Sequence, residues 1–413
     1  MKDSGIDWIG KIPDDWKVKR LKFVSKNRNE KYDKKYGILD YFSLENIESQ
    51  SGRYVETKNE YDISQSLICK KEDVVFGKLR PYLAKVYKVE KLSCCSSEFA
   101  VFYNFEGNSS FLKYYFLSDG FVKIVDSSTY GTKMPRANID FIRNMKVPLP
   151  PLSEQTKIAG FLDKKCSEID SVIEESKKSI EEYKSWKQSV IFEAVTGKNL
   201  SCKKKDTCIE WLGEIPETWE VRALKTIFRI FSGTTPKSDR TEYWDGNVKW
   251  ITPADFKTED VYVENGKRNI SENGFSDCSL ELIPINNLVF SKRAPIGKVC
   301  INKNEMCTNQ GCLACVKKIN LSIKFFYYLL SSLTEYFEVL GSGTTFKEIS
   351  LTSFSDFKVL FPPLSEQKSI AKFLDTKCAQ IDSLISEKQS LIKDLAEYKK
   401  SLIFDAVTGK RRM

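Results

Sequence analysis

Two blocks of residues occur twice in this chain, and their order constrains the architecture more than any other feature. Pro151-Leu-Ser-Glu-Gln155 recurs as Pro363-Leu-Ser-Glu-Gln367, and Ala194-Val-Thr-Gly-Lys198 recurs as Ala406-Val-Thr-Gly-Lys410. Both recurrences have an offset of 212 residues, and 27 of the 48 positions from the first block to the second are identical. Chance does not give such a match, so the chain contains an internal duplication.

A third block, built around two tryptophans, lies ahead of each of these segments. Asp7-Trp-Ile-Gly-Lys-Ile-Pro-Asp-Asp-Trp16 matches Glu210-Trp-Leu-Gly-Glu-Ile-Pro-Glu-Thr-Trp219 at an offset of 203 residues. The stretches that follow, about 23–145 and 226–357, share only scattered positions, and the second half is nine residues longer. A solenoid would repeat every 20–50 residues. The sequence therefore predicts a duplicated unit of tryptophan block, divergent domain and conserved segment.

The conserved segments carry a heptad pattern. Their seam positions are Leu162, Cys166, Ile169, Ile173, Ser176, Ile180, Tyr183 and Val190 in the first copy, and Leu374, Cys378, Ile381, Ile385, Lys388, Ile392, Leu395 and Leu402 in the second. Spacing that alternates four and three is typical of a coiled-coil seam. Each seam has a polar interruption, Ser176 or Lys388, which can fix the register of a pair.

The ends of these helices are also marked in the sequence. Ser153 is a suitable N-cap after a pair of prolines, and Glu154 places negative charge in the first turn. Gly197 and Gly409 stand where a C′ glycine would end each helix. We expect about 43 residues per helix, or roughly 65 Å at 1.5 Å per residue. Two near-equal helices favour an antiparallel pair, and the alternative is two separate amphipathic helices, each packed on its own domain.

The divergent domains contain short strand-like runs between turn residues. These are Asp73–Gly77, Ala84–Val89, Phe99–Tyr103 and Asn287–Ser291, with short helices expected at 111–117 and 323–333. Such a mixture is typical of α+β domains with a curved or barrel-like sheet.

The expected fold class is therefore α+β: two tandem α/β domains separated by two long antiparallel coiled-coil helices, with a pseudo-twofold internal repeat. The expected domains are 1–151, the first divergent domain; 152–198, the central helix; 199–209, a linker; 210–363, the second divergent domain; and 364–410, the distal helix.

Basic turns in the divergent domains are candidates for contact with nucleic acid. Phe76-Gly-Lys-Leu-Arg-Pro-Tyr82 leaves a predicted strand and is mirrored by Phe290-Ser-Lys-Arg-Ala-Pro-Ile296. Tyr130-Gly-Thr-Lys-Met-Pro-Arg136 is mirrored by Ser342-Gly-Thr-Thr-Phe-Lys347. Arginine and lysine in such turns bind phosphates or guanine edges, and glycine lets the backbone approach closely. The alternative is that these are ordinary solvated hairpin turns.

A third pair of polar segments follows a strand in each half. Ser96-Ser97-Glu98 is assigned as the equivalent of Thr308-Asn309-Gln310, and the two differ in chemistry. Asparagine and glutamine can pair with adenine through two hydrogen bonds, and glutamate can accept from cytosine. The complete set of DNA-binding candidates is Lys78, Arg80, Tyr82, Lys133, Arg136, Lys292, Arg293, Lys298, Asn309, Gln310, Thr344 and Lys347.

Composition supports a polyanionic partner and argues against catalysis by this chain. The formal net charge is +9, while residues 153–196 hold nine acids and seven bases, so the basic surplus lies in the rest of the chain. Charge concentrated on domains favours nucleic acid as a partner. There is no histidine in the sequence, which removes the commonest general base and metal ligand. We find no Walker A sequence and no Gly-x-Gly-x-x-Gly fingerprint.

Two patterns suggest other chemistry and are the weaker interpretations. Cys307, Cys312 and Cys315 have a C-x4-C-x2-C spacing seen in one class of iron–sulfur protein, but the same run also fits a buried strand. Pro13-Asp14 followed by Asp33-Lys-Lys35 loosely fits a nuclease pattern, but the second half lacks the corresponding acid. With 12 cysteines and no secretory signal, reduced thiols, a cytoplasmic location and no membrane span are expected.

The tandem order, the Pro-Pro-Leu-Ser-Glu-Gln openings (150–155 and 362–367) and the Ala-Val-Thr-Gly-Lys closings resemble the specificity subunits of type I restriction–modification enzymes. The resemblance covers nearly the whole chain. It implies two target-recognition domains, each contacting one part of a bipartite double-stranded DNA target with an unread spacer between the parts. It also implies two methylation subunits on the helices, additional restriction subunits, and no catalytic residue in this chain.

The same resemblance assigns the cofactors to the partners. S-adenosylmethionine, ATP and Mg²⁺ would be bound by the partner subunits and none by this chain, and methylation of an adenine in a duplex would need base flipping by the partner. Three alternatives stay open. They are a specificity subunit of a related system whose methylation and cleavage share one polypeptide, an enzyme such as a nuclease or iron–sulfur protein, and a coiled-coil adaptor that does not bind DNA.

Overall fold

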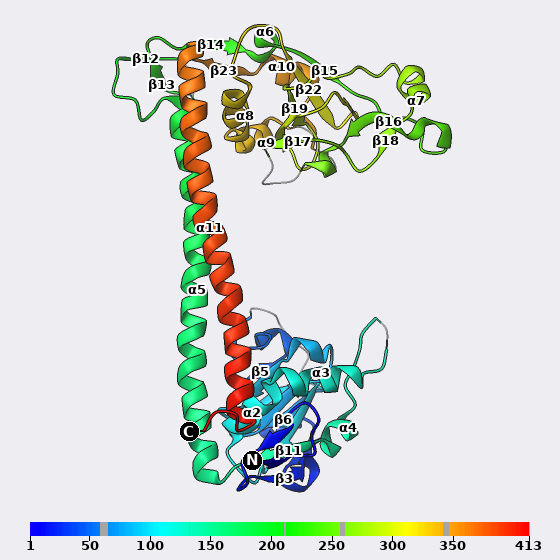
Figure 1. Cartoon of the computed structure of the whole chain (residues 1–413), viewed down its shortest axis with the longest axis vertical. Helices are drawn as coiled ribbons and strands as arrows, with labels where there is room; N and C mark the ends of the chain where they lie inside the picture. Colours follow the sequence, from blue (N-terminus) through cyan, green and yellow to red (C-terminus); the bar gives the residue numbers. More distant parts are fainter. Residues whose placement is uncertain are drawn as a thin grey trace. The chain divides into compact units, whose positions relative to one another are not determined.

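The computed structural model describes residues 1–57, 65–131, 133–207, 209, 212–256, 261–341 and 347–412. It divides into two compact units (Figure 1): unit 1 comprises Met1–Lys178 with Glu387–Met413, and unit 2 comprises Ser179–Ser386. The boundaries fall inside the two long helices, so each unit contains one divergent domain, the first part of one helix and the last part of the other.

The long helices are α5 (Leu152–Thr196) and α11 (Leu364–Val407), of 45 and 44 residues. α5 begins one residue before Ser153, and the Pro151 carbonyl accepts from the amides of Glu154 and Gln155. The prediction of Ser153 as the N-cap is therefore wrong, because Ser153 already lies inside the first turn. Gly197 has a φ of +68° directly after α5, as predicted for a C′ glycine. No helix in the described part of the chain is long and apolar enough to cross a membrane.

The helices pair antiparallel within each unit. In unit 1, Ile169 of α5 and Leu402 of α11 lie in one hydrophobic cluster, and the Lys399 ammonium lies 2.7 Å from the Asp170 carboxylate. In unit 2, Lys187 lies 2.7 Å from Asp382. These two ion pairs are equivalent by the offset of 212. Both lysines occupy positions of the heptad seam. The predicted seams did not include them.

The divergent fold of unit 1 consists of short elements. In chain order they are β1 (Lys2–Asp3), β2 (Lys11–Ile12), β3 (Lys17–Arg20), α1 (Leu21–Val24), β4 (Lys26–Arg28), η1 (Lys34–Tyr36), β5 (Tyr41–Phe42), η2 (Leu44–Asn46), β6 (Leu67–Cys69), β7 (Val74–Gly77), η3 (Pro81–Leu83), β8 (Val86–Lys88), β9 (Ser93–Cys95), β10 (Phe99–Tyr103), α2 (Ser109–Leu117), α3 (Asp119–Ser127), α4 (Ile139–Asn144) and β11 (Lys146–Leu149). The main sheets have the orders β4-β10-β7-β8 and β5-β9-β6.

Unit 2 repeats this plan with additions. Its elements are β12 (Lys204–Asp206), β13 (Glu214–Pro216), β14 (Glu220–Ala223), α6 (Leu224–Ile227), β15 (Phe228–Ser232), η4 (Thr241–Tyr243), β16 (Trp244–Ile251), η5 (Pro253–Asp255), β17 (Tyr262–Val263), β18 (Asn269–Ile270), α7 (Glu272–Asp277), β19 (Leu288–Ser291), β20 (Val299–Asn302), β21 (Cys307–Thr308), β22 (Cys312–Lys317), α8 (Ile323–Ser331), α9 (Thr334–Leu340), α10 (Leu351–Asp356) and β23 (Lys358–Phe361). The main sheets are β15-β22-β19-β20-β17 and β18-β16-β21.

The strand pairing bears on two expectations. Strand content predicted a curved or barrel-like sheet, and in the described residues the strands of each divergent fold form several short sheets, none of which is closed. In unit 1 a bridge between Lys31 and Leu67 joins the two main sheets. The segment 199–209 was expected to be a linker, but it contains β12, which pairs antiparallel with β13. β1 and β2 make the same pair at the start of unit 1. The tryptophan block of unit 2 therefore begins inside the expected linker.

The additional length of unit 2 lies early in its divergent fold. The offset between the halves is 203 at the tryptophan blocks and 214 at the central strands, where Phe76 corresponds to Phe290. α7 and β18 lie in this stretch and pack on β16. They bury Ile270 with Trp244 and Trp250 in a hydrophobic cluster of their own.

Candidate nucleic-acid interface

The residues that repeat between the halves hold each unit together. Trp16 is fully buried, and its indole Nε1 donates to Glu154 Oε2 at 3.0 Å; Trp219 is equally buried and donates to Glu366 at 2.7 Å. A buried indole N–H needs an acceptor. The glutamate of each Pro-Leu-Ser-Glu-Gln block therefore accepts a hydrogen bond from the second tryptophan of the preceding tryptophan block, 138 or 147 residues earlier in the sequence.

The neighbouring glutamines connect each long helix to its divergent fold. Gln155 Oε1 accepts from the Asn108 amide at 2.9 Å, and its Nε2 donates to the Pro150 carbonyl. Gln367 makes the same two bonds, with the Ser322 amide and with the Pro362 carbonyl. Asn108 and Ser322 are the N-caps of α2 and α8. The repeated block is thus a structural junction between each long helix and its divergent fold.

The closing glycines, Gly197 and Gly409, complete these repeated contacts. We name the set the framework: Trp16, Glu154, Gln155 and Gly409 in unit 1, with Trp219, Glu366, Gln367 and Gly197 in unit 2. A Cβ on Gly197 would lie 2.8 Å from the Pro216 ring, and one on Gly409 would lie 2.4 Å from the Pro13 ring. Both glycines also have positive φ, which a residue with a Cβ rarely adopts. The end of α11 therefore packs on the first tryptophan block, and the end of α5 packs on the second.

The basic turns of unit 1 converge at the exit of β7. The Lys78 amide donates to the Glu98 carbonyl at 2.8 Å, and the Lys78 carbonyl accepts from the Ala137 amide at 2.9 Å. The Arg80 amide donates to the Pro135 carbonyl. Three segments that are far apart in the sequence thus meet at one corner, which we name the β7 corner and define as Lys78, Arg80, Glu98 and Arg136. Lys78, Glu98 and Arg136 line an open pocket of about 580 Å³ at this corner.

One carboxylate balances the bases at the β7 corner. Arg136 Nε lies 3.1 Å from Glu98 Oε2, and Nη2 lies 2.9 Å from Oε1. Hydrogen bonding to Glu98 raises the pKa of the Arg136 guanidinium, so this group stays charged. Burial lowers the pKa of the Lys78 amine, and the charge of Glu98 partly offsets that shift. With the exposed Arg80, three bases and one acid therefore form the β7 corner.

Unit 2 has a corresponding corner at the exit of β19, which we name the β19 corner and define as Lys292, Arg293 and Glu348. Lys292 Nζ lies 2.8 Å from Glu348 Oε1, and Arg293 Nε lies 2.8 Å from Oε2. Burial opposes ionisation of Glu348, but hydrogen bonds from both bases lower the pKa of its carboxyl group overall. Sequence reasoning did not identify Glu348, because its partners lie more than 50 positions away and only the adjacent Lys347 hinted at a charged segment.

Each corner holds one acid against basic side chains, but the charged residues come from different segments in the two units. The backbone bridge between Arg293 and Glu348 in unit 2 corresponds to the bridge between Leu79 and Arg136 in unit 1. The same backbone position therefore carries Arg136 in one unit and Glu348 in the other.

The polar turn of unit 2 adjoins the β19 corner, since the Lys292 amide donates to the Gly311 carbonyl. Asn309 Oδ1 accepts from the Gly311 amide at 2.9 Å, and the Gln310 side chain accepts from Thr235 Oγ1. The strand pairing within each unit shows that Ser96-Ser97-Glu98 of unit 1 is equivalent to Asn309-Gln310-Gly311 of unit 2. The assigned equivalence with Thr308-Asn309-Gln310 is wrong by one position, because Thr308 is the last residue of β21 and is buried.

The other predicted residues are placed less uniformly. Lys133 is exposed in the turn that joins Tyr130 to Arg136, and Lys347 is exposed beside Glu348. Lys298 is half-buried at the β19–β20 connection, where its carbonyl accepts from the Ser291 amide. Thr344 lies outside the described residues.

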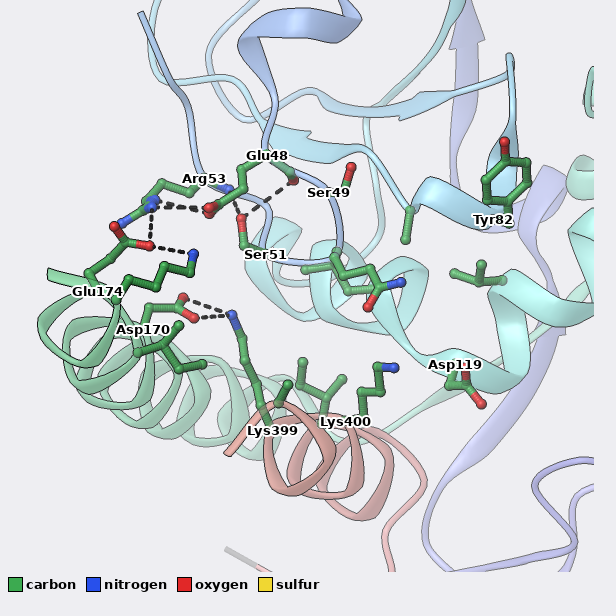
Figure 2. A pocket seen from close by; sticks show the side chains of 18 residues that line it. Glu48, Ser49, Ser51, Arg53, Tyr82, Asp119, Asp170, Glu174, Lys399 and Lys400 are labelled. Atoms are coloured by element: carbon green, nitrogen blue, oxygen red, sulfur yellow. Dashed lines mark hydrogen bonds and ion pairs between the residues drawn. The ribbon is translucent and has the colours of Figure 1, made fainter. Parts of the chain in front are cut away.

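Tyr82 is separate from the β7 corner. It is exposed and lines a second pocket of unit 1, of about 190 Å³, between the loop 48–53, α3 and the two helices. Figure 2 shows Tyr82 at one side of that pocket, with the Asp170–Lys399 pair at the other. Its counterpart in unit 2, Ile296, is a buried core residue. Tyr82 therefore has no equivalent in unit 2 and is not grouped with Lys78.

The two patterns that suggested other chemistry have local structural partners. Cys312 and Cys315 alternate along β22 and enter two different hydrophobic clusters, so they do not converge on one ion. Burial raises the pKa of the Cys307 thiol to about 12, which keeps it protonated. Asp14 pairs with the amino terminus of the chain, and Asp33 caps η1. Within the described residues, no three acids, cysteines or histidines are grouped as a metal site would need.

Comparison with known proteins fits this duplicated plan. The family described as "Type I restriction modification DNA specificity domain" matches the chain twice, over residues 13–182 and 216–394. The two matches fall on the two halves of the repeat.

Individual relatives match over different extents. The chain is 28% identical over 436 residues to the putative type I restriction enzyme MjaX specificity subunit of Methanocaldococcus jannaschii, covering 98% of this chain and 96% of that protein. It is 35% identical over 181 residues to the type I restriction enzyme MjaIX specificity subunit of the same organism. That second match covers 43% of this chain and 41% of the other, which is less than half of the relative's length.

Solved structures share the fold. A chain from the structure described as "Structural basis underlying complex assembly and conformational transition of the type I R-M system" matches with a TM-score of 0.81 and 21% identity, covering 97% of this chain and 100% of that chain. The HsdS subunit from Thermoanaerobacter tengcongensis matches with a TM-score of 0.59 and 20% identity, covering 97% and 98%. At these identities the likeness establishes the fold alone.

Proposed function

The chain belongs to the type I restriction–modification DNA specificity family, and from that premise we propose that its two divergent folds each contact one part of a bipartite DNA target. The observation that carries the proposal is the pair of basic corners at β7 and β19. They occupy corresponding places on a shared framework and differ in charge arrangement. Bases at such corners contact phosphates and guanine edges, and different arrangements select different sequences.

The helices are proposed to set the unread spacer between the two parts of the target. Both α5 and α11 contribute residues to both units without interruption. Removing seven residues, one heptad, from each helix keeps the seam in phase. We expect the deleted chain to select a shorter spacer while both half-sites stay unchanged. An unaltered spacer would contradict the role of the helices.

The helices are also proposed to bind two methylation subunits. Exposed apolar side chains lie one residue before seam positions and define what we name the outer flank: Val172, Leu391 and Tyr398 in unit 1, with Trp186, Phe373 and Leu384 in unit 2. By the offset of 212, Trp186 corresponds to Tyr398 and Val172 to Leu384. A surface present twice supports binding of two copies of one partner.

The outer flank faces away from the divergent fold of its own unit. Asp163 and Asp375 lie one residue after seam positions, and they accept hydrogen bonds from Tyr114 and Tyr328 of the divergent folds. One residue corresponds to about 100° around a helix, so residues before and after the seam lie on opposite sides of it. Exposed aromatic side chains on an otherwise charged helix are typical of interface anchors.

Binding at the outer flank can be tested one copy at a time. We expect Trp186→Asp or Tyr398→Asp alone to leave one methylation subunit bound, and the double variant to leave none, as measured by native mass spectrometry. Phe23→Asp is the matched control, because Phe23 is an exposed aromatic outside the helices. Retention of both copies by the double variant would place the partner elsewhere.

Catalysis is proposed to reside in the partners. The methylation subunits would bind S-adenosylmethionine, and restriction subunits would bind ATP and Mg²⁺, while this chain supplies recognition in the cytoplasm. An alternative partner is a single polypeptide that combines methylation and cleavage. Co-purification distinguishes the two, since one would give separate methylation and restriction chains and the other a single fused chain.

The decisive experiment is methylome sequencing of a host without its own methyltransferases that expresses this chain with its methylation partner. We expect a split adenine-methylated motif that disappears when this chain is omitted. Lys78→Ala combined with Arg80→Ala should then weaken selection at one half-site only. An assembled complex that gives no such motif, together with no salt-dependent DNA binding by the chain, would contradict the proposal.

A further inference from the structure

Each corner holds one carboxylate against basic side chains, although a negative charge on a DNA-binding surface repels phosphate. At the β7 corner the acid is Glu98, and at the β19 corner it is Glu348. The lysines correspond between the units, but the acids come from different segments. An acid that is present at both corners from different positions requires a reason other than shared ancestry.

The geometry of the Arg136–Glu98 pair supplies that reason. Glu98 binds the guanidinium from the side, through Nε and Nη2. This leaves Nη1 and one hydrogen of Nη2, the outer edge of the group, without a partner among the described residues. That outer edge is the part of arginine that pairs with O6 and N7 of guanine. Both Glu98 oxygens accept from Arg136, and each keeps a further lone pair.

We propose that Glu98 is a positioning residue that holds Arg136 with its outer edge directed at a guanine, and that Glu348 does the same for Arg293. The Glu348–Arg293 contact uses Nε, which again leaves the outer nitrogens free within the described residues. A guanidinium held by a carboxylate loses less rotamer entropy when it binds a base. This inference rests on the proposed DNA-binding function and adds the residues that confer selectivity.

Unit 1 also contains a matched control. Glu48 binds Arg53 from the side with the same pair of contacts, each 3.1 Å long. Figure 2 shows that Arg53 also faces Glu174 of α5, 3.9 Å away, so acids flank it on two sides. Arg53 thus joins a loop to a helix, and its Nη2 lies near a second carboxylate, which none of the described residues supplies to Arg136.

The test measures binding of the full chain to its methylation-defined duplex and to duplexes with single base changes, over a range of salt concentrations. We expect Glu98→Ala to lower discrimination at one guanine of one half-site by about 10-fold to 100-fold. Its binding to unrelated DNA should become tighter at low salt, because one repelling charge is gone. Arg136→Lys should lose the same discrimination without that gain, and Glu48→Ala should change neither quantity.

The outcomes separate the possible roles. Equal tightening on every duplex with discrimination intact would show Glu98 to be only a repelling charge and would overturn the inference. Weakening at both half-sites would show a general structural role and would also overturn it. If the wild-type chain binds all duplexes alike, the proposed function itself fails. Arg136→Lys keeps the test usable if Glu98→Ala does not fold, since it alters only the recognising group.

Discussion

Trp16 and Trp219 occupy the same place in the two units with the same acceptor, whereas Arg136 and Glu348 occupy the same backbone place with opposite charge. The first pair is buried and bonded to the shared helices, and the second lies on the surface of the divergent folds. The difference shows that the duplication preserved contacts within the framework and left the corners free to change. Damage to the framework should therefore reduce stability, and damage to a corner should reduce recognition.

The largest expected effect is on the framework. Trp16→Ala removes a fully buried indole and leaves the Glu154 carboxylate without its donor. Substitutions of this kind cost about 3–5 kcal/mol. Hydrogen-exchange mass spectrometry should show loss of protection in unit 1, and Trp219→Ala should show the same loss in unit 2. If either variant unfolded both units equally, the two units would not be independent in stability.

Removing the lysine of a seam ion pair should give the next largest loss of stability, and the loss should differ between the two units. Lys399 is 8% exposed, whereas its equivalent Lys187 is 27% exposed. Lys399→Ala leaves Asp170 facing a partly buried seam, which we expect to cost about 1–3 kcal/mol. Lys187→Ala breaks a more solvated pair and should cost about 0.2–1 kcal/mol. Hydrogen-exchange rates along each helix measure the loss of stability in both variants. Equal losses would mean that burial does not distinguish the two ion pairs.

The helices of the framework could be predicted from the sequence, but the hydrogen bonds and ion pairs that hold the framework together could not. The heptad pattern and the glycines within the segments repeated at an offset of 212 predicted both long helices and their ends. They did not show that Glu154 bonds Trp16, because the pair is separated by 138 residues and no local pattern joins them. Lys187 and Lys399 were left out of the predicted seams, although Lys388 was included as a polar interruption. Their occurrence at one position in both copies was the available signal.

The corners were predicted in part. Lys78 and Lys292 were identified because a base after a strand and before a turn is visible locally. Whether such a base is free or paired depends on segments that fold back onto it, and sequence spacing does not give those. Glu348 pairs with Lys292 across more than 50 residues, and near Thr308 the offset between the units differs by one residue from the 212 of the conserved helices. Divergent loops therefore hid both the partners and the alignment.

The smallest expected effect concerns the pH dependence of the β19 corner. The pKa of Glu348 in the folded chain lies below its ordinary value of 4.5, because hydrogen bonds from Lys292 and Arg293 outweigh the cost of burial. A depressed carboxyl pKa stabilises the fold above the unfolded-state value, and that contribution is lost as pH falls through the folded-state value. Wild type should therefore lose protection around Glu348 as the pH falls below about 4.5, by less than about 1 kcal/mol for so solvated a cluster. Glu348→Gln removes the titrating group, so local exchange near β19 should no longer depend on pH in that window. If the variant kept the full dependence, another acid would be responsible, and the ion cluster of unit 2 would not be what holds Arg293 in place.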